Sequence, residues 1–465
     1  MTIRFVIIGG GPAGVEAAAV ASRLGAEVVL IEKKVLGGLA NLYDCVPSKA
    51  MIATGSAITR SWRSKDLGLI GQTLQPDLGV IRSRINSIAS DLTESIQEQL
   101  ISQGVVIRHG QGRLLSPNSV EVTYCTGMGE EEKQDPGKEK EIFTADAILL
   151  ATGSYPRVPE WADVDGDRIM LTKHAYPPQV VPEHLVVVGS GVTGVEFVHM
   201  FRSLGSKVTL IVSRQQVLPG KDPEVAAALE ADFLESNVTL VKGARATSAI
   251  AENNQVQVLC EDGRKISGSH ALIAVGSIPA SADLGLENAG ITTDGSGYVQ
   301  VNHHCQSNLS HIYAAGDLSG RLQLASVAQS QGRKIAEHVM GLHTREHRHI
   351  DYDKAASAIF TEPEIADVGL AEAEAFAQGR KIRVTKVPFA RNAKAMIDGD
   401  SRGFVKLLSD PNTGVILGGS IVGAHAAELI SVIAVAVTCR LRVEDLQEAL
   451  FVHPALAEAI SAAAE

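Results

Sequence analysis

Cys45 is the residue whose surroundings most clearly favour chemistry. It lies in the segment Gly37–Lys49, and Pro47, two residues later, suits the first turn of a helix. Cys45 would then stand at the N-terminus of that helix, with Lys49 one turn further along the same side. A helix N-terminus and a nearby ammonium both favour a thiolate, so the pattern predicts a reactive sulfur. A buried, unreactive cysteine is the alternative.

Two glycine triplets have the spacing G-x-G-x-x-G. The first comprises Gly9, Gly11 and Gly14. It follows an apolar run over residues 3–8 and precedes an alanine-rich stretch, as a strand and a helix would. The glycines allow a tight turn, close approach of a pyrophosphate and close packing of the helix on the strand. Glu32 ends the next apolar run, where a carboxylate can accept hydrogen bonds from an adenosine ribose. Glycines serving packing alone are the alternative, but the whole pattern predicts a dinucleotide site.

The second triplet comprises Gly189, Gly191 and Gly194. It lies between an expected strand over 185–188 and an expected helix reaching about residue 204. The next strand ends at Val212, so the carboxylate is missing, and Ser213 and Arg214 follow. A hydroxyl and a guanidinium suit a 2'-phosphate, so NADPH is expected to be tolerated; an ordinary solvated arginine is the alternative. Two such units in one chain predict electron transfer between two dinucleotides.

Four further motifs complete the pattern, namely Ala151–Gly153, Ala314–Asp317, Phe360–Glu364 and His453–Glu458. With the Cys45 segment, they resemble the pyridine nucleotide disulfide oxidoreductases, the group of dihydrolipoamide dehydrogenase and glutathione reductase, over essentially the whole chain. The resemblance implies an α/β fold with two Rossmann-like dinucleotide-binding domains and a C-terminal α+β dimerisation domain. The implied FAD domain spans 1–153 and 277–345, the NAD(P)H domain 154–276 and the homodimer interface domain 346–465.

The resemblance also implies roles for individual residues. FAD contacts are expected from Gly9, Gly11, Pro12, Ala13, Gly14, Glu32, Lys33, Gly38, Lys49, Ala151, Thr152, Gly153, Gly316, Asp317 and Ala325. NADPH or NADH contacts are expected from Gly189, Gly191, Val192, Thr193, Gly194, Glu196, Ser213, Arg214 and Gly276. Asp317 would bind the flavin ribitol, and Lys49, paired with Glu196, would lie near the flavin N5 atom. Cys45 would contact the flavin.

The chain departs from this family at one decisive position. Members that reduce disulfides carry C-x-x-x-x-C, and here Ala40 replaces the first cysteine while Cys45 keeps the second. Dithiol exchange needs a second thiolate, which a methyl group cannot supply. Tyr43 and Asp44 also replace smaller residues. In lacking the first cysteine, the chain resembles the LpdA-type NAD(P)H:quinone reductases. That resemblance implies hydride transfer from NAD(P)H to FAD and then to a quinone or similar diffusible acceptor.

Two other functions stay open at this point. One is a single-cysteine thiol or peroxide reductase, or a dihydrolipoamide dehydrogenase-like enzyme, that uses Cys45. The other is a non-catalytic, redox-sensing flavoprotein. In the dithiol enzymes the C-terminal histidine is an acid or base that is oriented by the glutamate and reaches the other subunit. By this resemblance His453, oriented by Glu458, could donate a proton to a quinone oxygen. A purely structural histidine at the dimer interface is equally compatible.

The remaining histidines are considered as possible metal ligands. His303 adjoins His304, and the string His343–His347 spells H-x-x-E-H, with His349 following. That pattern binds zinc only on a helix, and Gly341 is expected to end the preceding helix. The sequence therefore predicts solvated surface histidines and no metal.

Composition limits the classes of protein that remain. The chain has 465 residues, 45% of them hydrophobic and 20% charged, which is globular and long enough for about three domains. A net charge of -11 without basic clusters argues against nucleic acid, and five scattered cysteines argue against a disulfide framework. No apolar run is long enough for a membrane span, and residues 1–11 lack a signal-peptide pattern, so a cytoplasmic location is expected.

The elements that would position these residues can be placed along the chain. Two βαβ units carry the glycine triplets, and helical spacing extends from Pro47 to about Gln103. The Glu- and Lys-rich segment Thr126–Glu141 is expected to be an exposed loop. After residue 346, strand signals at Phe404–Leu408 and Val415–Val422 precede helical runs, as in an α+β domain.

Overall fold

The computed structural model describes residues 2–70, 74–126, 133–134, 140–342 and 349–465. These residues form two compact units. Unit 1 comprises residues 1–48, 82–157 and 277–352, and unit 2 comprises residues 49–81, 158–276 and 353–465. The boundaries at 48/49 and 81/82 fall inside the helices α3 (Val46–Arg63) and α4 (Leu78–Ser102).

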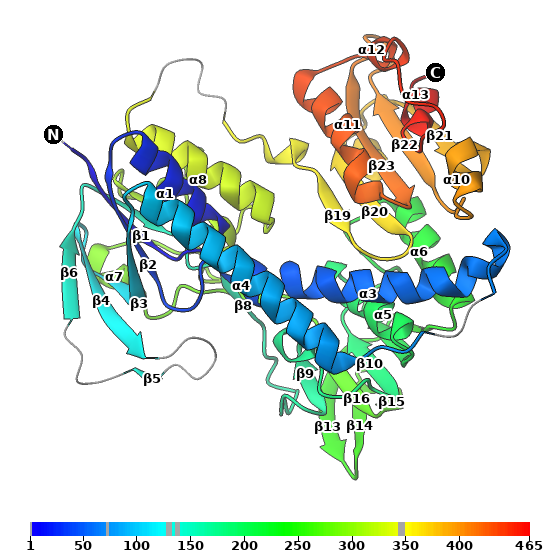
Figure 1. The fold of residues 1–465 in the computed structure, drawn as a ribbon, viewed down its shortest axis with the longest axis horizontal. Coiled ribbons are helices and arrows are strands. Elements are labelled where there is room, and N and C mark those ends of the chain that lie inside the picture. Colours follow the sequence, from blue (N-terminus) through cyan, green and yellow to red (C-terminus); the bar gives the residue numbers. More distant parts are fainter. Residues whose placement is uncertain (1, 71–73, 127–132, 135–139, 343–348) are drawn as a thin grey trace. The chain divides into compact units, whose positions relative to one another are not determined.

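An eight-stranded sheet forms the centre of unit 1 (Figure 1), in the order β18-β7-β1-β2-β3-β4-β5, with β6 also paired to β4. The strands are β1 (Arg4–Ile8), β2 (Glu27–Glu32), β3 (Val106–Ser116), β4 (Ser119–Thr126), β5 (Lys133–Gln134), β6 (Lys140–Thr144), β7 (Ala147–Leu150) and β18 (Ile312–Ala314). The pairs from β18 to β3 are parallel, and β4 pairs antiparallel with β3, β5 and β6.

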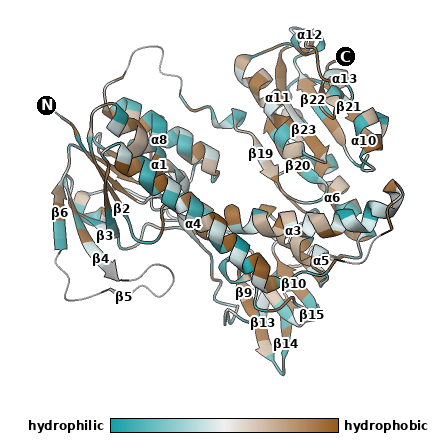
Figure 2. Ribbon diagram, in the orientation of Figure 1, coloured by the Kyte–Doolittle hydropathy of each residue, from teal (hydrophilic) through white to brown (hydrophobic). Residues whose placement is uncertain are grey.

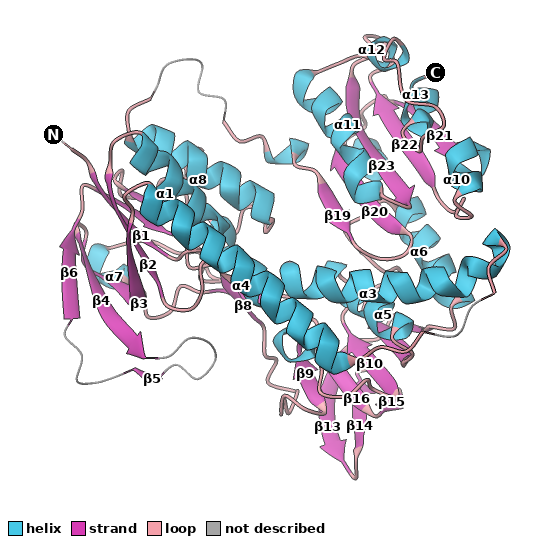
Figure 3. Cartoon of the chain, in the orientation of Figure 1, coloured by secondary structure: helices cyan, strands magenta, loops and turns pink. Residues whose placement is uncertain are grey.

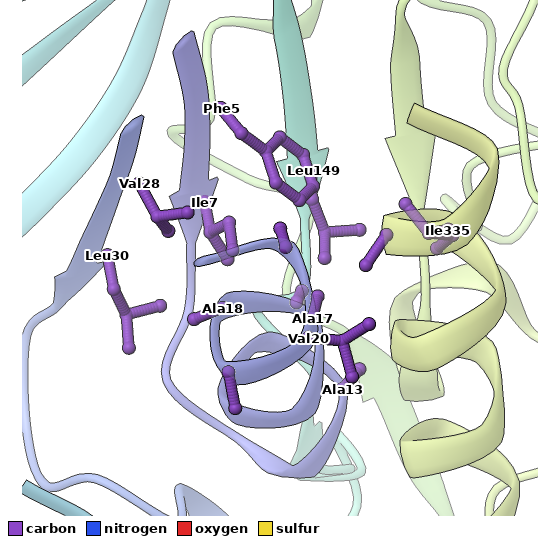
Figure 4. Close-up of a cluster of buried hydrophobic side chains, with 14 of the residues drawn as sticks. Phe5, Ile7, Ala13, Ala17, Ala18, Val20, Val28, Leu30, Leu149 and Ile335 are labelled. Atoms are coloured by element: carbon purple, nitrogen blue, oxygen red, sulfur yellow. The ribbon is translucent and has the colours of Figure 1, made fainter. Parts of the chain in front are cut away.

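Strand β1 is apolar after its first residue because both of its faces are buried. Phe5 and Ile7 belong to a core with α1 (Pro12–Arg23) and α8 (Ala325–Val339), drawn in Figure 4. Val6 and Ile8 belong to the core on the opposite face. Helices α1 and α8 approach closely, since a Cβ on Gly332 would lie 2.2 Å from the Ala13 carbonyl oxygen.

Shorter elements complete unit 1. They are α2 (Leu39–Leu42), α7 (Leu286–Ala289), the 3₁₀ turn η3 (Gly316–Ser319) and the antiparallel pair β8 (Ser154–Pro156) and β17 (Ser277–Pro279). The segment Thr126–Glu141 is not the simple loop expected from the sequence. Thr126 pairs with Lys133, and residues 140–141 belong to β6, because this stretch continues an antiparallel meander; the rest lies outside the described residues.

Unit 2 begins with a five-stranded sheet whose paired strands are all parallel, in the order β12-β11-β10-β16-β9. Its strands are β9 (Ile169–Leu171), β10 (His184–Val188), β11 (Lys207–Val212), β12 (Thr239–Lys242) and β16 (His270–Ile273). The helices α5 (Val192–Ser203) and α6 (Pro223–Glu235) accompany it, and β13 (Ala246–Glu252), β14 (Gln255–Cys260) and β15 (Lys265–Gly268) form a separate antiparallel sheet. The expected strand, turn and helix around the second glycine triplet are thus confirmed.

The C-terminal part of unit 2 is an antiparallel sheet with helices, in the order β19-β20-β23-β22-β21 (Figure 3). Its elements are β19 (Ser357–Ile359), β20 (Glu364–Gly369), α9 (Glu372–Ala377), β21 (Arg383–Pro388), α10 (Ala393–Ile397), β22 (Phe404–Ser409), β23 (Ile416–Gly423), α11 (Ala426–Cys439), α12 (Val443–Gln447) and α13 (Glu458–Ala464). Ile421, Ile433 and Ile460 share one buried core. The α+β character expected after residue 346 is therefore confirmed.

The helical region expected over residues 47–103 is α3 and α4, joined by a 3₁₀ turn at Ser64–Leu67 and a short connection. Figure 2 shows α4 carrying both hydrophilic and hydrophobic residues along its length, as expected for a helix with one solvated side. Among the described residues, no helix is both long enough and apolar enough to cross a membrane.

Candidate active site

The first glycine triplet forms the β1–α1 turn of unit 1. Gly9 has φ +107°, and a Cβ there would lie 2.3 Å from the Ala151 carbonyl oxygen. A Cβ on Gly14 would lie 1.9 Å from the Gly9 carbonyl oxygen, so both positions require glycine. A Cβ on Gly11 would instead meet no atom within 4 Å. That open space before the N-terminus of α1, which begins at Pro12, fits a pyrophosphate.

Glu32 presents its carboxylate to this turn from the end of β2. Oε2 accepts a hydrogen bond from the Gly10 N–H at 2.6 Å, and Oε1 accepts one from the Lys34 N–H at 2.7 Å. Burial raises the pKa of Glu32, and the two N–H groups oppose that rise. The carboxylate is thus held in one orientation at the strand end, where a ribose hydroxyl would reach it in a dinucleotide fold.

Asp317 lies in the turn after β18, on the short helix η3. Its carboxylate accepts a hydrogen bond from the Ser154 hydroxyl at 2.7 Å, and burial raises its pKa. The Gly316 N–H donates to the Gln331 side chain at 2.7 Å, which ties this turn to α8. Sequence reasoning missed Ser154 and Gln331, because neither belongs to one of the motifs and no local spacing connects them with the Asp317 turn.

The other residues expected around FAD also lie in unit 1, apart from Lys49. Gly38 has φ +61°, and a Cβ there would lie 2.8 Å from the Gly11 Cα, so it packs against the glycine turn. The Thr152 hydroxyl donates to the Ala280 carbonyl at 2.8 Å. The Lys33 ammonium lies 5.9 Å from the centre of the Tyr155 ring. Pro12 and Ala13 open α1, Ala151 and Gly153 follow β7, and Ala325 opens α8.

The second glycine triplet forms the β10–α5 turn of unit 2. Gly189 has φ +115°, and a Cβ on Gly194 would lie 1.8 Å from the Gly189 carbonyl oxygen. A Cβ on Gly191 would meet no atom within 4 Å, and Val192 and Thr193 are exposed beside it at the start of α5. The turn therefore has the same open space for a pyrophosphate as the first one.

The end of β11 differs from the end of β2. Val212 is buried there, and the side chains that follow, Ser213 and Arg214, are both exposed. A hydroxyl and a guanidinium at this position can bind a phosphate by charge-assisted hydrogen bonds. Gly276, the last residue expected to contact the nicotinamide cofactor, has φ +95° and follows β16.

Lys49 and Glu196 form an ion pair within unit 2. The Lys49 Nζ lies 2.9 Å from Glu196 Oε2, and the glutamate side chain is only 8% exposed. Glu196 Oε1 accepts a hydrogen bond from the Phe360 N–H at 3.0 Å, and the Lys49 ammonium lies 4.9 Å from the centre of the Phe360 ring. The family resemblance implied the pairing of Lys49 with Glu196 but gave no role to Phe360, although Phe360 opens one of the motifs that carry the resemblance.

Cys45 directly precedes α3, as the position of Pro47 predicted, and its side chain is exposed. The alternative of a buried cysteine is therefore wrong for this chain. Ala40, which replaces the first cysteine of the dithiol motif, lies in α2. The described free cysteines are Cys45, Cys260, Cys305 and Cys439.

His453 and Glu458 lie in unit 2 and contact each other. The His453 Nδ1 lies 2.8 Å from Glu458 Oε1, and the Ala455 N–H donates to Glu458 Oε2 at 2.8 Å. These contacts hold the pKa of Glu458 below its usual range, the backbone N–H contributing most. The His453 side chain is 74% exposed, so its ring is oriented by the carboxylate and open on its other side.

Three of the histidines considered above as possible metal ligands come together in unit 1, namely His303, His304 and His349. The H-x-x-E-H string at 343–347 lies outside the described residues. Gly341 has φ +69° and follows the end of α8 at Val339, so the expected helix end is confirmed.

Two matches to a known family agree with this site, which consists of the two glycine turns, the strand-end carboxylate and the Lys49–Glu196 pair. Residues 3–332 match the family described as pyridine nucleotide-disulphide oxidoreductase, and residues 355–464 match the dimerisation domain of that family. The chain belongs to this family. Its members use FAD and NAD(P)H, and the chain is a flavin-dependent oxidoreductase.

Individual relatives cover almost the whole chain. The NAD(P)H dehydrogenase (quinone) of Mycobacterium tuberculosis is 39% identical over 475 residues, covering 100% of this chain and 94% of the relative. The dihydrolipoyl dehydrogenase of Bacillus subtilis is 30% identical, covering 99% and 96%. Among solved structures, LpdA from Mycobacterium tuberculosis has a TM-score of 0.92 at 38% identity, covering 100% and 99%. The HOCl-induced flavoprotein disulfide reductase RclA from Escherichia coli has a TM-score of 0.86 at 25% identity, covering 99% of both chains.

Proposed function

We propose that this chain is an FAD-dependent NAD(P)H:quinone oxidoreductase that works without a dithiol relay. The observation that carries the proposal is Ala40, a methyl side chain at the position where disulfide-reducing members have their first cysteine. Cys45 alone cannot resolve a mixed disulfide. The similarity to a quinone dehydrogenase of Mycobacterium tuberculosis over the full chain supports the same acceptor class.

The residues of unit 1 would bind FAD. Bound FAD supplies the chemistry of accepting a hydride from NAD(P)H and passing electrons to a quinone. Gly11 leaves room for its pyrophosphate, Glu32 would accept hydrogen bonds from its adenosine ribose, and Asp317 would bind its ribitol. We assign residues 1–153 and 277–345 to this domain, residues 154–276 to the NAD(P)H domain and residues 346–465 to the interface domain.

The Lys49–Glu196 pair would supply electrostatic stabilisation near the flavin. The Lys49 ammonium favours nearby negative charge, and Glu196 with Phe360 holds that ammonium in place. Cys45 would contact the flavin and adjust its electronic properties, without forming a covalent bond to substrate.

His453 would donate a proton to the quinone oxygen. Glu458 orients the imidazole through Nδ1 and leaves the other side of the ring exposed. In the dithiol enzymes of this family the C-terminal histidine reaches the other subunit, so the working unit here would be a homodimer, consistent with the match to the dimerisation domain. The cytoplasmic location expected from the sequence stays a prediction.

Steady-state kinetics with two classes of acceptor test this function. The FAD-loaded protein should oxidise NADPH much faster when menadione or benzoquinone is added, and lipoamide or glutathione disulfide should not accelerate it. Efficient turnover of either disulfide would contradict the proposal. The variant Ala40→Cys is a sharper version of the test, because it restores both cysteines of the motif and should be the only form that gains any disulfide reduction.

A single-cysteine mechanism is the second candidate, favoured by the exposure of Cys45 at the N-terminus of α3. Cys45→Ala separates the two candidates. Direct transfer to a quinone should survive the substitution, whereas a thiol- or peroxide-dependent activity should be lost. Rapid bleaching of the flavin by NADPH in a stopped-flow experiment would exclude a non-catalytic flavoprotein.

A further inference from the structure

Unit 1 contains a cluster of histidines that the proposed redox chemistry does not use. The ring centres of His303 and His304 are 4.0 Å apart, and His349 lies 4.4 Å from the first and 5.5 Å from the second. One nitrogen of each ring lies within 4.8 Å of the other two. His303 and His349 are exposed, so solvent ions can reach the cluster.

The backbone and a fourth ring hold part of this cluster in place. The Asn302 side chain accepts hydrogen bonds from the His304 N–H at 2.8 Å and the Gln306 N–H at 3.0 Å, which fixes the turn that carries His303 and His304. The His338 ring stacks on His304 with centres 4.6 Å apart. His338 is itself oriented by the Tyr313 hydroxyl, 2.8 Å from its Nδ1. The turn and His304 are therefore preorganised.

We propose that His303, His304 and His349 form a binding site for a divalent transition metal of the Zn²⁺ or Cu²⁺ class. Neutral imidazole nitrogens are preferred ligands for these ions, and three of them leave a position for water. Tetrahedral ligands at about 2.05 Å from the ion lie about 3.3 Å from each other. Rotation of the exposed His303 and His349 side chains would bring the ring nitrogens from within 4.8 Å of one another to that separation.

The described residues contain a second group of potential metal ligands, and it differs from the histidine cluster because a lysine already neutralises it. Asp222, Glu224 and Glu372 also lie close together, in unit 2. The Lys406 ammonium lies among them, 2.7 Å from Glu372 and 3.3 Å from Asp222, and also pairs with Glu224. A cation of the protein itself thus already occupies the acidic group.

The metal would join two segments far apart in the sequence. His349 lies 45 residues after His304 (349 minus 304) and shortly before the boundary of unit 1 at residue 352. Binding to the folded chain alone would stabilise this connection by mass action. The site needs no participation of the flavin, so its test is independent of quinone reduction.

Calorimetric titration with Zn²⁺ tests the proposal on the FAD-loaded full chain, with any affinity tag removed and metals first stripped by a chelator. We expect one Zn²⁺ per chain, and binding weaker by at least about tenfold in His303→Asn and His349→Asn. His425→Asn, which removes an exposed histidine elsewhere, should bind like the parent. No Zn²⁺ binding by the parent, or unchanged binding by both cluster variants, would overturn the proposal.

Two further measurements keep the result interpretable. Flavin absorbance and the thermal midpoint without metal establish that each variant is folded, and His303→Asn serves where His349→Asn does not fold. Electron paramagnetic resonance with Cu²⁺ should show coupling to imidazole nitrogens that weakens in the folded variant. An identical spectrum in parent and variant would place the copper elsewhere and refute the site.

Discussion

The β1–α1 and β10–α5 turns bring their first glycine to nearly the same backbone angle, φ +107° at Gly9 and +115° at Gly189. In both, a Cβ on the third glycine would collide with the carbonyl oxygen of the first, at 1.9 Å and 1.8 Å respectively. The two turns are 180 positions apart (189 minus 9) and share one backbone conformation. That backbone places the N-terminus of a helix at the turn, an arrangement that suits a pyrophosphate.

The side chains around the two turns differ. Glu32 offers a carboxylate at the end of β2, whereas β11 ends in Val212 followed by Ser213 and Arg214. Within the helices, Ala19 of α1 corresponds to His199 of α5, and Glu16 corresponds to Glu196. The comparison teaches that the glycine spacing sets the backbone of the turn, and we propose that the neighbouring side chains decide which dinucleotide binds there.

Replacing the third glycine of each turn should have the largest effect. Gly14→Ala should cost about 4 kcal/mol or more and abolish FAD binding, because its Cβ would collide with a backbone oxygen. Gly194→Ala should keep the flavin but slow its reduction by NADPH at least about a hundredfold. Gly295→Ala, where a Cβ meets no atom within 4 Å, is the control. Flavin content and stopped-flow reduction measure both effects, and normal values in Gly14→Ala would contradict the shared geometry.

His199 should make unit 2 sensitive to acid. It is buried, its Nε2 has no hydrogen-bond partner among the described residues, and burial lowers its pKa from 6.5 to about 4. The unfolded chain therefore binds the proton first, and stability present above pH 6.5 is lost as the pH falls toward 4, by roughly 3 kcal/mol.

The variant His199→Leu should remove that loss while filling a similar volume. Urea titrations of parent and variant at pH 7.5 and pH 4.5 measure the difference between them. An equal decrease in stability in both proteins would show that another group causes the acid sensitivity.

The two corresponding glutamates should differ in their contribution to stability. Glu196→Gln should cost about 2 kcal/mol, because it weakens the partly buried ion pair in which the Glu196 side chain is only 8% exposed and Lys49 is 33% exposed. Glu16→Gln should cost less than about 0.5 kcal/mol, because Glu16 pairs with Arg333, whose side chain is 58% exposed. Urea midpoints measure the loss of stability in both variants. Equal losses would show that the two glutamates do not differ in their contribution to stability.

Replacing Arg214 should change only the choice of cofactor. Arg214→Ala should lower kcat/KM for NADPH about tenfold, about 1.4 kcal/mol, and leave NADH unchanged, since only NADPH carries the 2'-phosphate. Arg380→Ala, which removes an exposed arginine elsewhere, should change neither. An equal decrease in kcat/KM with NADPH and NADH would mean that Arg214 does not bind the 2'-phosphate.

Local pattern was enough to predict much of the fold. The strands and helices around both glycine triplets, the start of α3 near Pro47 and the end of α8 before Gly341 follow from steric rules that act over a few residues. The segment Thr126–Glu141 was predicted less well, because polar residues in an exposed antiparallel pair resemble those of a loop.

The sequence by itself determined the two dinucleotide turns, their different strand ends and the missing first cysteine, since each depends on residue type at a local spacing. Only the tertiary structure decided that Phe360 completes the Lys49–Glu196 pair, that His199 Nε2 is buried without a hydrogen-bond partner among the described residues, and that His349 joins His303 and His304. Those contacts connect residues far apart in the chain, and their formation depends on sheet order and helix packing rather than on any local pattern.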